Sequence, residues 1–258
     1  MSTQSASAPA PRGLGATSRR DWWWLSPLII VVALSAFGIY SLYAILVNAD
    51  YHYTGGGADY ISPFYSPNVE TLFGIDVPFS PALLVAWMPL GLRLTCYYYR
   101  KAYYRSFFLA PPACAVAGPT RKRYTGESKF PLVLQNVHRY FLYLAIVVLG
   151  FLWYDAGQAF FFDDGFGVGL GSLVLLVNVC FLTAFTFGCN SLRHLVGGRL
   201  DCFTCSAMAR ARHTAWRGVT VLNLRHMGWA WVSLTSVALA DLYIRLAASG
   251  VFHDPRII

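Results

Sequence analysis

Residues 25–47 read LSPLIIVVALSAFGIYSLYAILV, an apolar run without a charged side chain. About 20 helical residues are enough to cross the ~30 Å hydrocarbon core of a bilayer, so this run is long enough to span a membrane. The three tryptophans that precede it, Trp22, Trp23 and Trp24, are typical of the aromatic belt at a membrane surface. The stretch therefore predicts a transmembrane helix.

Four further apolar segments have comparable lengths and clear ends, at residues 81–99, 134–153, 169–188 and 227–246. The whole chain is 56% hydrophobic and 12% charged, and its mean hydropathy is +0.47, which is too apolar for a soluble domain of this length. We predict an all-α integral membrane protein, a bundle of five transmembrane helices formed by residues 21–258. Residues 1–20 are rich in Ser, Ala, Pro and Gly and predict a disordered cytoplasmic tail.

The Lys and Arg residues are confined to alternate connections between these segments. Three precede the first segment, nine lie between Arg93 and Arg139, and six lie between Arg193 and Arg225, out of 20 in the chain. Residues 48–80 and 154–168 contain Asp and Glu but no Lys or Arg. Because cytoplasmic loops carry the excess of Lys and Arg, this pattern predicts a cytoplasmic N-terminus and an external C-terminus. It also explains the net charge of +8 without nucleic-acid binding.

Cysteine and histidine residues gather on the predicted cytoplasmic side. Cys180 lies in the middle of a segment, and His52 and His253 lie on the opposite side. The others lie at or beyond the cytoplasmic ends of the segments, and they are Cys96, Cys114, Cys189, Cys202, Cys205, His138, His194, His213 and His226. The cytoplasm is reducing, so structural disulfides are not expected there. Thiolates and imidazoles together are the ligands that iron uses in redox proteins, which predicts a redox cofactor.

Three histidines at helix ends are the candidate imidazole ligands: His138, His194 and His226. Cys202 and Cys205 form a C-x-x-C pair, a spacing that lets two thiolates bind one metal ion. Two cofactors fit these residues, a b-type haem held by imidazoles or a Rieske-type [2Fe-2S] cluster held by two Cys and two His. Two stacked haems would need ligands near both faces, so at most one haem is expected.

Aromatic and cationic residues at the same helix ends are candidates for binding a lipid-soluble quinone, because they supply hydrogen-bond donors to a carbonyl oxygen. They are Tyr97, Tyr98, Arg100, Arg225, Trp229 and Trp231. Anchoring in the aromatic belt is the competing interpretation for most of them. Asp241 and Arg245 are one helical turn apart in the last segment, and we expect them to form a structural ion pair.

Several stretches together resemble the membrane-anchor subunit of actinobacterial-type succinate dehydrogenase. They are RLTCYYYRKAYYRSFF (93–108), PPAC (111–114), QNVHRY (135–140), RHLVGG (193–198) and RHMGWAW (225–231). The resemblance covers most of the chain after residue 21. It implies a multi-pass subunit of respiratory complex II in the bacterial plasma membrane, with a flavoprotein and an iron-sulfur protein docked on its cytoplasmic face and menaquinone or ubiquinone as electron acceptor.

The resemblance also bears on the cofactor. Histidines at both faces are the pattern of anchors with two haems, and this sequence departs from it. Its set of Cys and His residues is more similar to that of anchors with a membrane-embedded Rieske-type cluster. We favour this cluster over a single haem. Cys96 and Cys114 lie within the stretches that carry the resemblance, so they join the candidate ligands.

Two other interpretations remain open. In one, the chain is an anchor without a cofactor, and a cluster of its partner reduces the quinone directly. In the other, it is a membrane transporter, for which inverted repeats or ionisable residues at mid-membrane are typical. Neither feature stands out in the sequence. The resemblance to the succinate dehydrogenase anchor also leaves room for a further small membrane subunit beside the chain.

Overall fold

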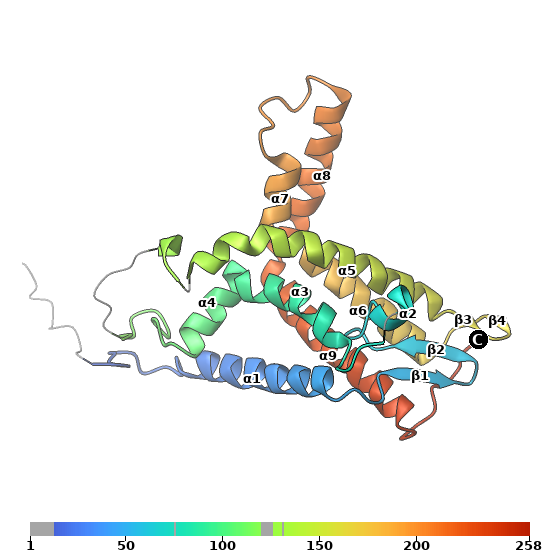
Figure 1. Cartoon of the computed structure of the whole chain (residues 1–258). Helices are drawn as coiled ribbons and strands as arrows, with labels where there is room; N and C mark the ends of the chain where they lie inside the picture. The colour runs from blue at the N-terminus through green and yellow to red at the C-terminus, as the bar shows by residue number, and fades with distance from the viewer. Residues whose placement is uncertain (1–12, 75, 120–125, 131) are drawn as a thin grey trace, which may run out of the picture. The chain divides into compact units, whose positions relative to one another are not determined.

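The structure is a computed structural model that describes residues 13–74, 76–119, 126–130 and 132–258. Its longer helices are α1 (Leu25–Leu46), α3 (Ala82–Thr95), α4 (Tyr97–Ser106), α5 (His138–Gln158), α6 (Leu170–Phe187), α8 (Ala207–Leu224) and α9 (His226–Ala248) (Figure 1). The shorter ones are α2 (Val69–Phe73), α7 (Asn190–Gly197) and the 3-10 turns Gly126–Ser128 and Leu132–Val137. Two small antiparallel hairpins pair β1 (His52–Gly55) with β2 (Ala58–Ile61) and β3 (Phe161–Phe162) with β4 (Gly165–Phe166). The prediction of a mainly helical fold is confirmed.

Four of the described helices are long and apolar enough to cross a membrane: Leu25–Leu46, Leu132–Gln158, Leu170–Phe187 and His226–Ala248. They lie at four of the five predicted spans, to within a few residues at each end. The segment predicted at 81–99 is instead divided at Cys96, whose extended backbone separates α3 from α4. The 14 residues of α3 are fewer than the ~20 that a full crossing requires. Five spans and the orientation of the termini stay predictions.

The described residues belong to two compact units. Unit 1 comprises Met1–Ala36 and Cys96–Gln135, and unit 2 comprises Phe37–Thr95 and Asn136–Ile258. The predicted tail, residues 1–20, falls in unit 1, and its first 12 residues lie outside the described part. Further along, the Thr17 hydroxyl donates to the carbonyl of Ala115 at 2.7 Å, so this part of the segment contacts the loop that follows α4.

Unit 2 is built on α5, α6 and α9, with α6 packed against both others and α3 packed along α5. The contact between α3 and α5 is close because Gly91 has no side chain: a Cβ there would lie 2.1 Å from the ring of Phe141. Sequence-adjacent α5 and α6 run antiparallel, as do α6 and α9. One end of the bundle therefore holds the start of α5, the end of α6 and the start of α9. We call it the α7 end, and the opposite end, with both β-hairpins, the strand end.

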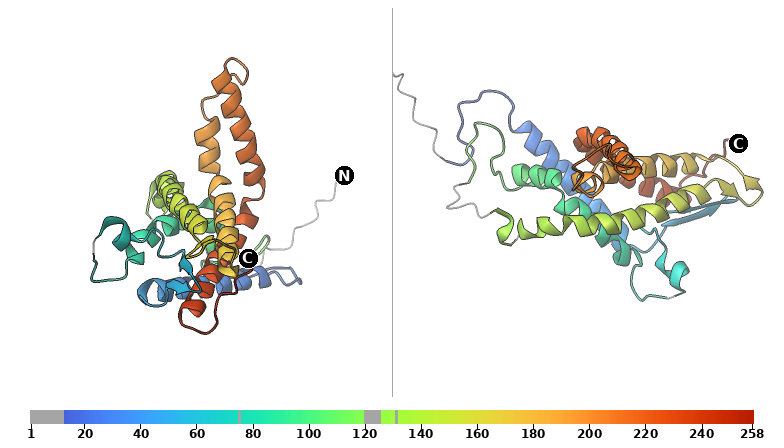
Figure 2. Two further views of the ribbon diagram at one scale, coloured as in Figure 1. Left: turned by 90° about the vertical axis from the view of Figure 1, so that its right-hand side faces the viewer. Right: turned by 90° about the horizontal axis from the view of Figure 1, so that it is seen from above.

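The α7–α8 hairpin extends beyond the α7 end of the bundle (Figures 1 and 2). Helix α7 continues from α6 after a break at Cys189, and α8 leads into α9 through Arg225. The two hairpin helices pack closely where Gly197 meets the indole of Trp216. Five Arg residues and one Asp lie between Arg193 and Arg217, so the hairpin is strongly cationic.

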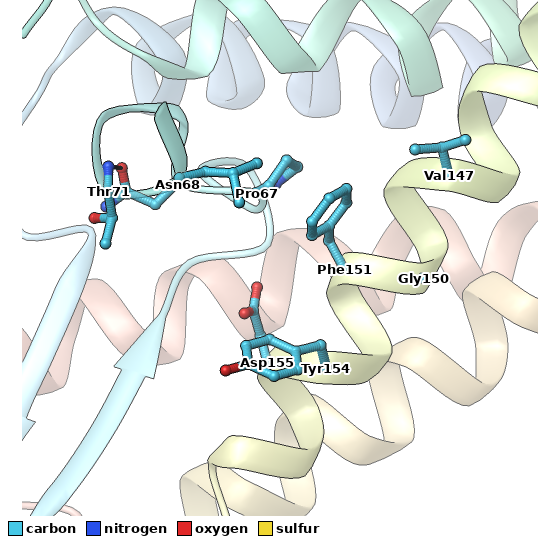
Figure 3. Close-up of a pocket in the computed structure, with 9 residues that line it drawn as sticks. Pro67, Asn68, Thr71, Val147, Gly150, Phe151, Tyr154 and Asp155 are labelled. Carbon is cyan, nitrogen blue, oxygen red and sulfur yellow. Dashed lines mark hydrogen bonds between the residues drawn. The ribbon is translucent and has the colours of Figure 1, made fainter. Parts of the chain in front are cut away.

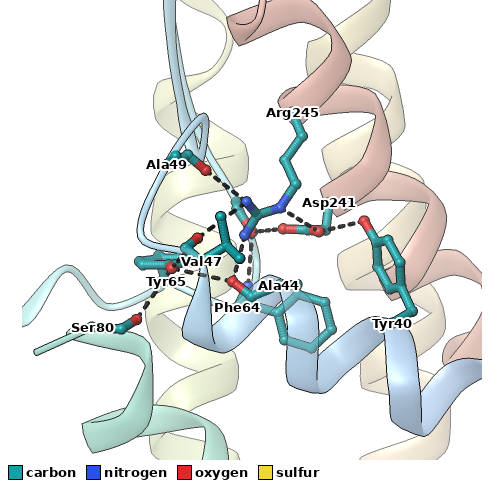
Figure 4. A network of polar contacts seen from close by, with 10 residues as sticks. Tyr40, Ala44, Val47, Ala49, Phe64, Tyr65, Ser80, Asp241 and Arg245 are labelled. Atoms are coloured by element: carbon teal, nitrogen blue, oxygen red, sulfur yellow. Dashed lines mark hydrogen bonds and ion pairs between the residues drawn. The ribbon is translucent and has the colours of Figure 1, made fainter.

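A buried ion pair links α9 to α1 at the strand end (Figure 4). The Arg245 Nε donates to Oδ2 of Asp241 at 2.9 Å, which confirms the predicted pairing. Tyr40 of α1 donates to the same carboxylate at 2.5 Å, and the Ser62 hydroxyl donates to its other oxygen. Arg245 also donates to the carbonyl of Ala44 at 2.6 Å. Arg245 therefore pairs with Asp241 and also donates a hydrogen bond to a backbone carbonyl at the C-terminal end of α1, which has no partner within the helix.

The C-terminal segment is attached to the strand end by Asp254. Its carboxylate accepts hydrogen bonds from the Tyr60 hydroxyl at 2.9 Å, from the Gly171 N–H at 2.8 Å and from the Tyr243 hydroxyl. Burial raises the pKa of Tyr60 to about 12, and the nearby Asp254 charge acts in the same direction. The Tyr60 phenol therefore stays protonated, and remains a donor, far above neutral pH.

We expect Asp254→Asn to lower the free energy of unfolding by ~1–3 kcal/mol, because an amide oxygen replaces a charged acceptor of three donors. Thermal unfolding of the purified protein in detergent measures this. Asp163→Asn is the matched control, since Asp163 is an exposed residue at the same end. Equal midpoints for the two variants would contradict the role assigned to Asp254.

Candidate functional site

Two histidines and a cysteine lie at the α7 end of unit 2, each at a helix boundary. His138 is the first residue of α5, His226 is the first residue of α9, and Cys189 separates α6 from α7. His138 is 7% exposed and Cys189 is 4% exposed. The fold thus brings three potential ligands, far apart in sequence, to one end of the bundle. Two of them, His138 and His226, were predicted.

The hydrogen bonds of His138 define its tautomer. The Thr95 hydroxyl donates to the Gly91 carbonyl at 2.6 Å, so its proton is already used. The His138 Nδ1, 2.9 Å from the Thr95 Oγ1, must therefore carry the proton and donate it to that oxygen. His138 Nε2 is then the nitrogen with a free lone pair, and it faces the Cys189 sulfur at 3.1 Å. A histidine oriented in this way by its Nδ1–H is ready to bind a metal through Nε2.

Cys189 is a protonated thiol in this arrangement. Burial raises the pKa of the thiol, and the backbone N–H groups of Ser191 and Leu192 oppose part of that rise. The neutral S–H group can donate to Nε2 of His138, which fits the tautomer above. No pattern in the sequence distinguishes Cys189 from the other cysteines, and it was not among the predicted ligands. Its position at the end of an apolar segment, level with His138, is the signal that was available.

His226 packs on a ring that also contacts a buried arginine. Its imidazole stacks on Phe185 with ring centroids 5.0 Å apart, and the guanidinium carbon of Arg93 lies 4.6 Å from the same Phe185 centroid. Arg93 is 9% exposed and donates to the Ser233 hydroxyl at 3.1 Å. A buried positive charge beside the site stabilises any added negative charge, such as a transferred electron.

The other predicted ligands lie elsewhere. His194 is an exposed residue of α7. Cys202 and Cys205 form a disulfide in the loop that joins α7 to α8, at the far tip of the hairpin, so the expectation of no disulfide on this side was wrong. Cys114 is exposed in the loop after α4 in unit 1. Cys96 is buried at the N-terminal boundary of α4, also in unit 1, and follows Thr95 directly in the chain.

The site fits a metal cofactor in its chemistry but not in its present side-chain positions. Buried imidazoles and a thiol are the donors that iron-sulfur and haem centres use. However, His138 and Cys189 form a direct hydrogen bond with each other, so they would have to separate to hold a metal between them. Among the residues that the structure describes, no group of three or more His, Cys, Asp or Glu side chains is arranged to hold a metal ion.

Comparisons with known proteins agree with this architecture. A family model described as actinobacterial succinate dehydrogenase subunit SdhC matches residues 25–250. The chain belongs to this SdhC family. A solved structure titled "Mycobacterium smegmatis Sdh1 complex in the apo form" contains a chain with 42% sequence identity and a TM-score of 0.85; the match covers 100% of the present chain and 98% of that one. No curated protein matches.

The SdhC family assignment makes the chain a membrane subunit of a bacterial succinate dehydrogenase complex, which confirms the resemblance found in its sequence. Its four long apolar helices agree with that location.

The predicted quinone-binding residues of this SdhC chain divide between the two units. In unit 1, Tyr97 and Arg100 line a pocket of about 400 Å³, and Tyr98 packs on Tyr99. Arg100 also forms an ion pair with Glu127 at 2.5 Å. In unit 2, the remaining candidates lie at or near the start of α9, and they are Arg225, Trp229 and Trp231.

Trp229 differs from the other candidates in one respect. It lies one helical turn after His226, and its indole Nε1 is buried without a hydrogen-bond partner among the described residues. An unsatisfied buried N–H group is costly, and a ligand carbonyl would satisfy it. Trp229 is therefore the candidate that the geometry favours most within unit 2.

Proposed function

We propose that this SdhC chain anchors the flavoprotein and iron-sulfur subunits of succinate dehydrogenase in the membrane and passes their electrons to a quinone. The observation that carries the proposal is the group formed by the buried His138 and Cys189 and the half-buried His226 at the α7 end. These are redox-metal donors in a membrane subunit of a succinate-oxidising complex. Arg93 beside them favours the electron-rich state.

We propose further that the group holds a Rieske-type [2Fe-2S] cluster, with imidazoles from His138 and His226 and a thiolate from Cys189. Such a cluster would supply one-electron transfer when bound. The donor chemistry supports the buried His138 and the half-buried His226 over His194, which is exposed. Cys96, which the sequence analysis named as a candidate ligand, belongs to unit 1 and is not assigned to this group. A b-type haem bound by the two imidazoles is the alternative.

The chain's own residues prepare this site. Thr95 fixes the proton of His138 on Nδ1 and so leaves Nε2 as the ligand atom. Arg93, buried against Phe185, offsets the charge of an arriving electron. The apolar helices around the group keep water away from it. Trp229, one turn along α9, would donate a hydrogen bond from its indole N–H to a quinone carbonyl.

The cationic α7–α8 hairpin is the surface that we assign to docking of the soluble subunits. It protrudes from the bundle and exposes large apolar side chains beside its arginines, including Phe203 and Met208, which are 51% and 70% exposed. Mixed apolar and arginine-rich surfaces are typical of protein interfaces. The orientation predicted from the charges places this hairpin in the cytoplasm.

Reconstitution tests the proposed function. The flavoprotein and iron-sulfur subunits are prepared with and without this chain, and succinate oxidation is followed with a soluble dye and with a membrane quinone. We expect dye reduction in both preparations and quinone reduction only when the chain is present. Equal quinone reduction without the chain would contradict the proposal.

Trp229→Phe is expected to raise the KM for quinone about 5- to 30-fold, because one hydrogen bond of ~1–2 kcal/mol is lost while the aromatic ring is kept. Steady-state kinetics with a short-chain quinone measures the effect, and dye reduction should stay unchanged. Trp153→Phe is the matched control, since that indole N–H already donates to Thr183. An unchanged KM in Trp229→Phe would remove Trp229 from the quinone site.

A further inference from the structure

A second pocket lies at the strand end of unit 2, opposite the redox group (Figure 3). Its volume is about 670 Å³. The loop and short helix α2 form one wall, and α5 forms the other; the lining residues are Pro67, Asn68, Thr71, Leu72, Val147, Gly150, Phe151, Tyr154 and Asp155. Volumes of this size are usual for sites of small molecules.

The polar end of the pocket offers a carboxylate with spare capacity to accept hydrogen bonds. Asp155 Oδ2 is buried, and the hydroxyl of the neighbouring Ser66 is a hydrogen-bond donor beside the carboxylate, which can accept further donors. The Asn68 side-chain oxygen, by contrast, already accepts the N–H groups of Glu70 and Thr71. A ligand that brings a donor to Asp155 would therefore remove an unfavourable desolvation cost.

The rest of the α5 wall is apolar and open toward the surroundings of the bundle. Val147, Gly150, Phe151 and Tyr154 are spaced by three and four residues, so they share one face of α5. Val147 is 58% exposed and Tyr154 is 63% exposed, and a Cβ at Gly150 would meet no atom within 4 Å. In a membrane this face contacts lipid chains. The pocket is thus polar at one end and apolar along its length.

The charged residues around the pocket favour a positively charged ligand. None of its lining residues is basic, and residues 48–80 and 154–168 contain no Lys or Arg. Glu70 of α2 adds a second carboxylate nearby. Asp155 also lies in the last turn of α5, where the helix dipole is negative and favours a positive charge. The rings of Phe151 and Tyr154 provide faces that attract ammonium groups.

We propose that this pocket binds the primary ammonium group of an amphiphile, with Asp155 as its acceptor and the hydrocarbon chain along Val147, Gly150 and Phe151. An aminophospholipid such as phosphatidylethanolamine, with its acyl chain against α5, supplies this chemistry in a membrane. A free alkylamine supplies the same chemistry from another source.

The site is independent of the proposed electron transfer. Asp155 lies 17 residues after His138 on the same helix, which at ~1.5 Å per residue separates them by about 25 Å. The proposal can therefore fail or succeed without changing the account of quinone reduction.

The test uses the intact succinate dehydrogenase complex in nanodiscs that contain equal amounts of phosphatidylethanolamine and phosphatidylcholine. After extraction into detergent and extensive washing, the retained lipids are measured by mass spectrometry. The variant is Asp155→Asn, which keeps the shape of the side chain. The control is Asp163→Asn, an exposed acidic residue at the same end.

We expect the native complex to retain phosphatidylethanolamine over phosphatidylcholine, because a trimethylated ammonium has no N–H to donate to Asp155. Asp155→Asn should reduce this retention about tenfold, as expected for the loss of one charge-assisted hydrogen bond. Quinone reduction should not change in either variant.

Dodecylamine and dodecanol identify the source of the ammonium. Displacement of the retained phosphatidylethanolamine by dodecylamine, but not by dodecanol, supports a lipid ligand. Binding of dodecylamine that depends on Asp155, without retained phosphatidylethanolamine, supports a free amine as the ligand. Equal retention of both phospholipids together with no effect of Asp155→Asn on dodecylamine binding overturns the proposal, as does co-purification of quinone that is lost in Asp155→Asn.

Discussion

His138→Ala is expected to abolish electron transfer from succinate to quinone while the reduction of a soluble dye continues at the native rate. The variant removes both the Nε2 atom that faces Cys189 and the hydrogen bond to Thr95. Loss of an outer hydrogen-bond partner of a metal ligand alone costs ~10–100-fold, so loss of the ligand itself should exceed about 100-fold. The ratio of the two rates in the purified complex measures the effect.

Two further variants test whether the effect of His138→Ala comes from the redox group rather than from general damage to the complex. Thr95→Val retains the imidazole but removes the oxygen that holds its Nδ1 proton, and it should lower quinone reduction about 10-fold. His253→Ala is the control, because this imidazole is exposed at the strand end, away from the redox group. A His138→Ala complex that reduces quinone at the native rate would show that the anchor needs no cofactor at this site.

Asp241→Ala is expected to destabilise unit 2 by ~3–5 kcal/mol, because it leaves the charge of Arg245 buried without its carboxylate. Asp241 is 0% exposed, and it also accepts from Tyr40 and Ser62, so three donors lose their partner together. Thermal unfolding of the purified complex measures the loss. Asp241→Asn should give a smaller loss of the same sign, and it keeps the prediction testable where the Ala variant fails to fold.

Asp164→Ala is the matched control for Asp241→Ala. Its ion pair with Arg256, at 2.8 Å, also lies at the strand end but is largely exposed. Exposed pairs contribute about 0–1 kcal/mol, so this variant should unfold close to the native midpoint. A loss in Asp241→Ala no larger than in Asp164→Ala would mean that the buried pair contributes no more than an exposed one.

The sequence was sufficient to predict features that depend on residues close together in the chain. Apolar length located four of the membrane helices, and the four-residue spacing of Asp241 and Arg245 was enough to predict their pairing. The division of the second segment at Cys96 was not predicted, since the apolar pattern continues across it. The prolines offered no guide either, because Pro89 lies inside α3 rather than at the break.

Contacts between distant segments were the part that the sequence could not supply. Cys189 meets His138 only because α6 ends where α5 begins, and Asp254 contacts Tyr60 only because the C-terminal segment returns to β2. Local spacing can also mislead, as Cys202 and Cys205 show. Their spacing is typical of a metal site, yet they lie at the tip of the hairpin, away from His138 and His226.

Electron paramagnetic resonance of the anaerobically reduced complex tests the central claim, an embedded redox centre at the α7 end, most directly. The account predicts a low-average-g signal of Rieske type in addition to those of the soluble subunits, absent from His138→Ala and unchanged in His253→Ala. A sharp reduced α-band in the visible spectrum would instead identify a haem. Iron content equal to that of the soluble subunits alone, with neither signal, would contradict the claim.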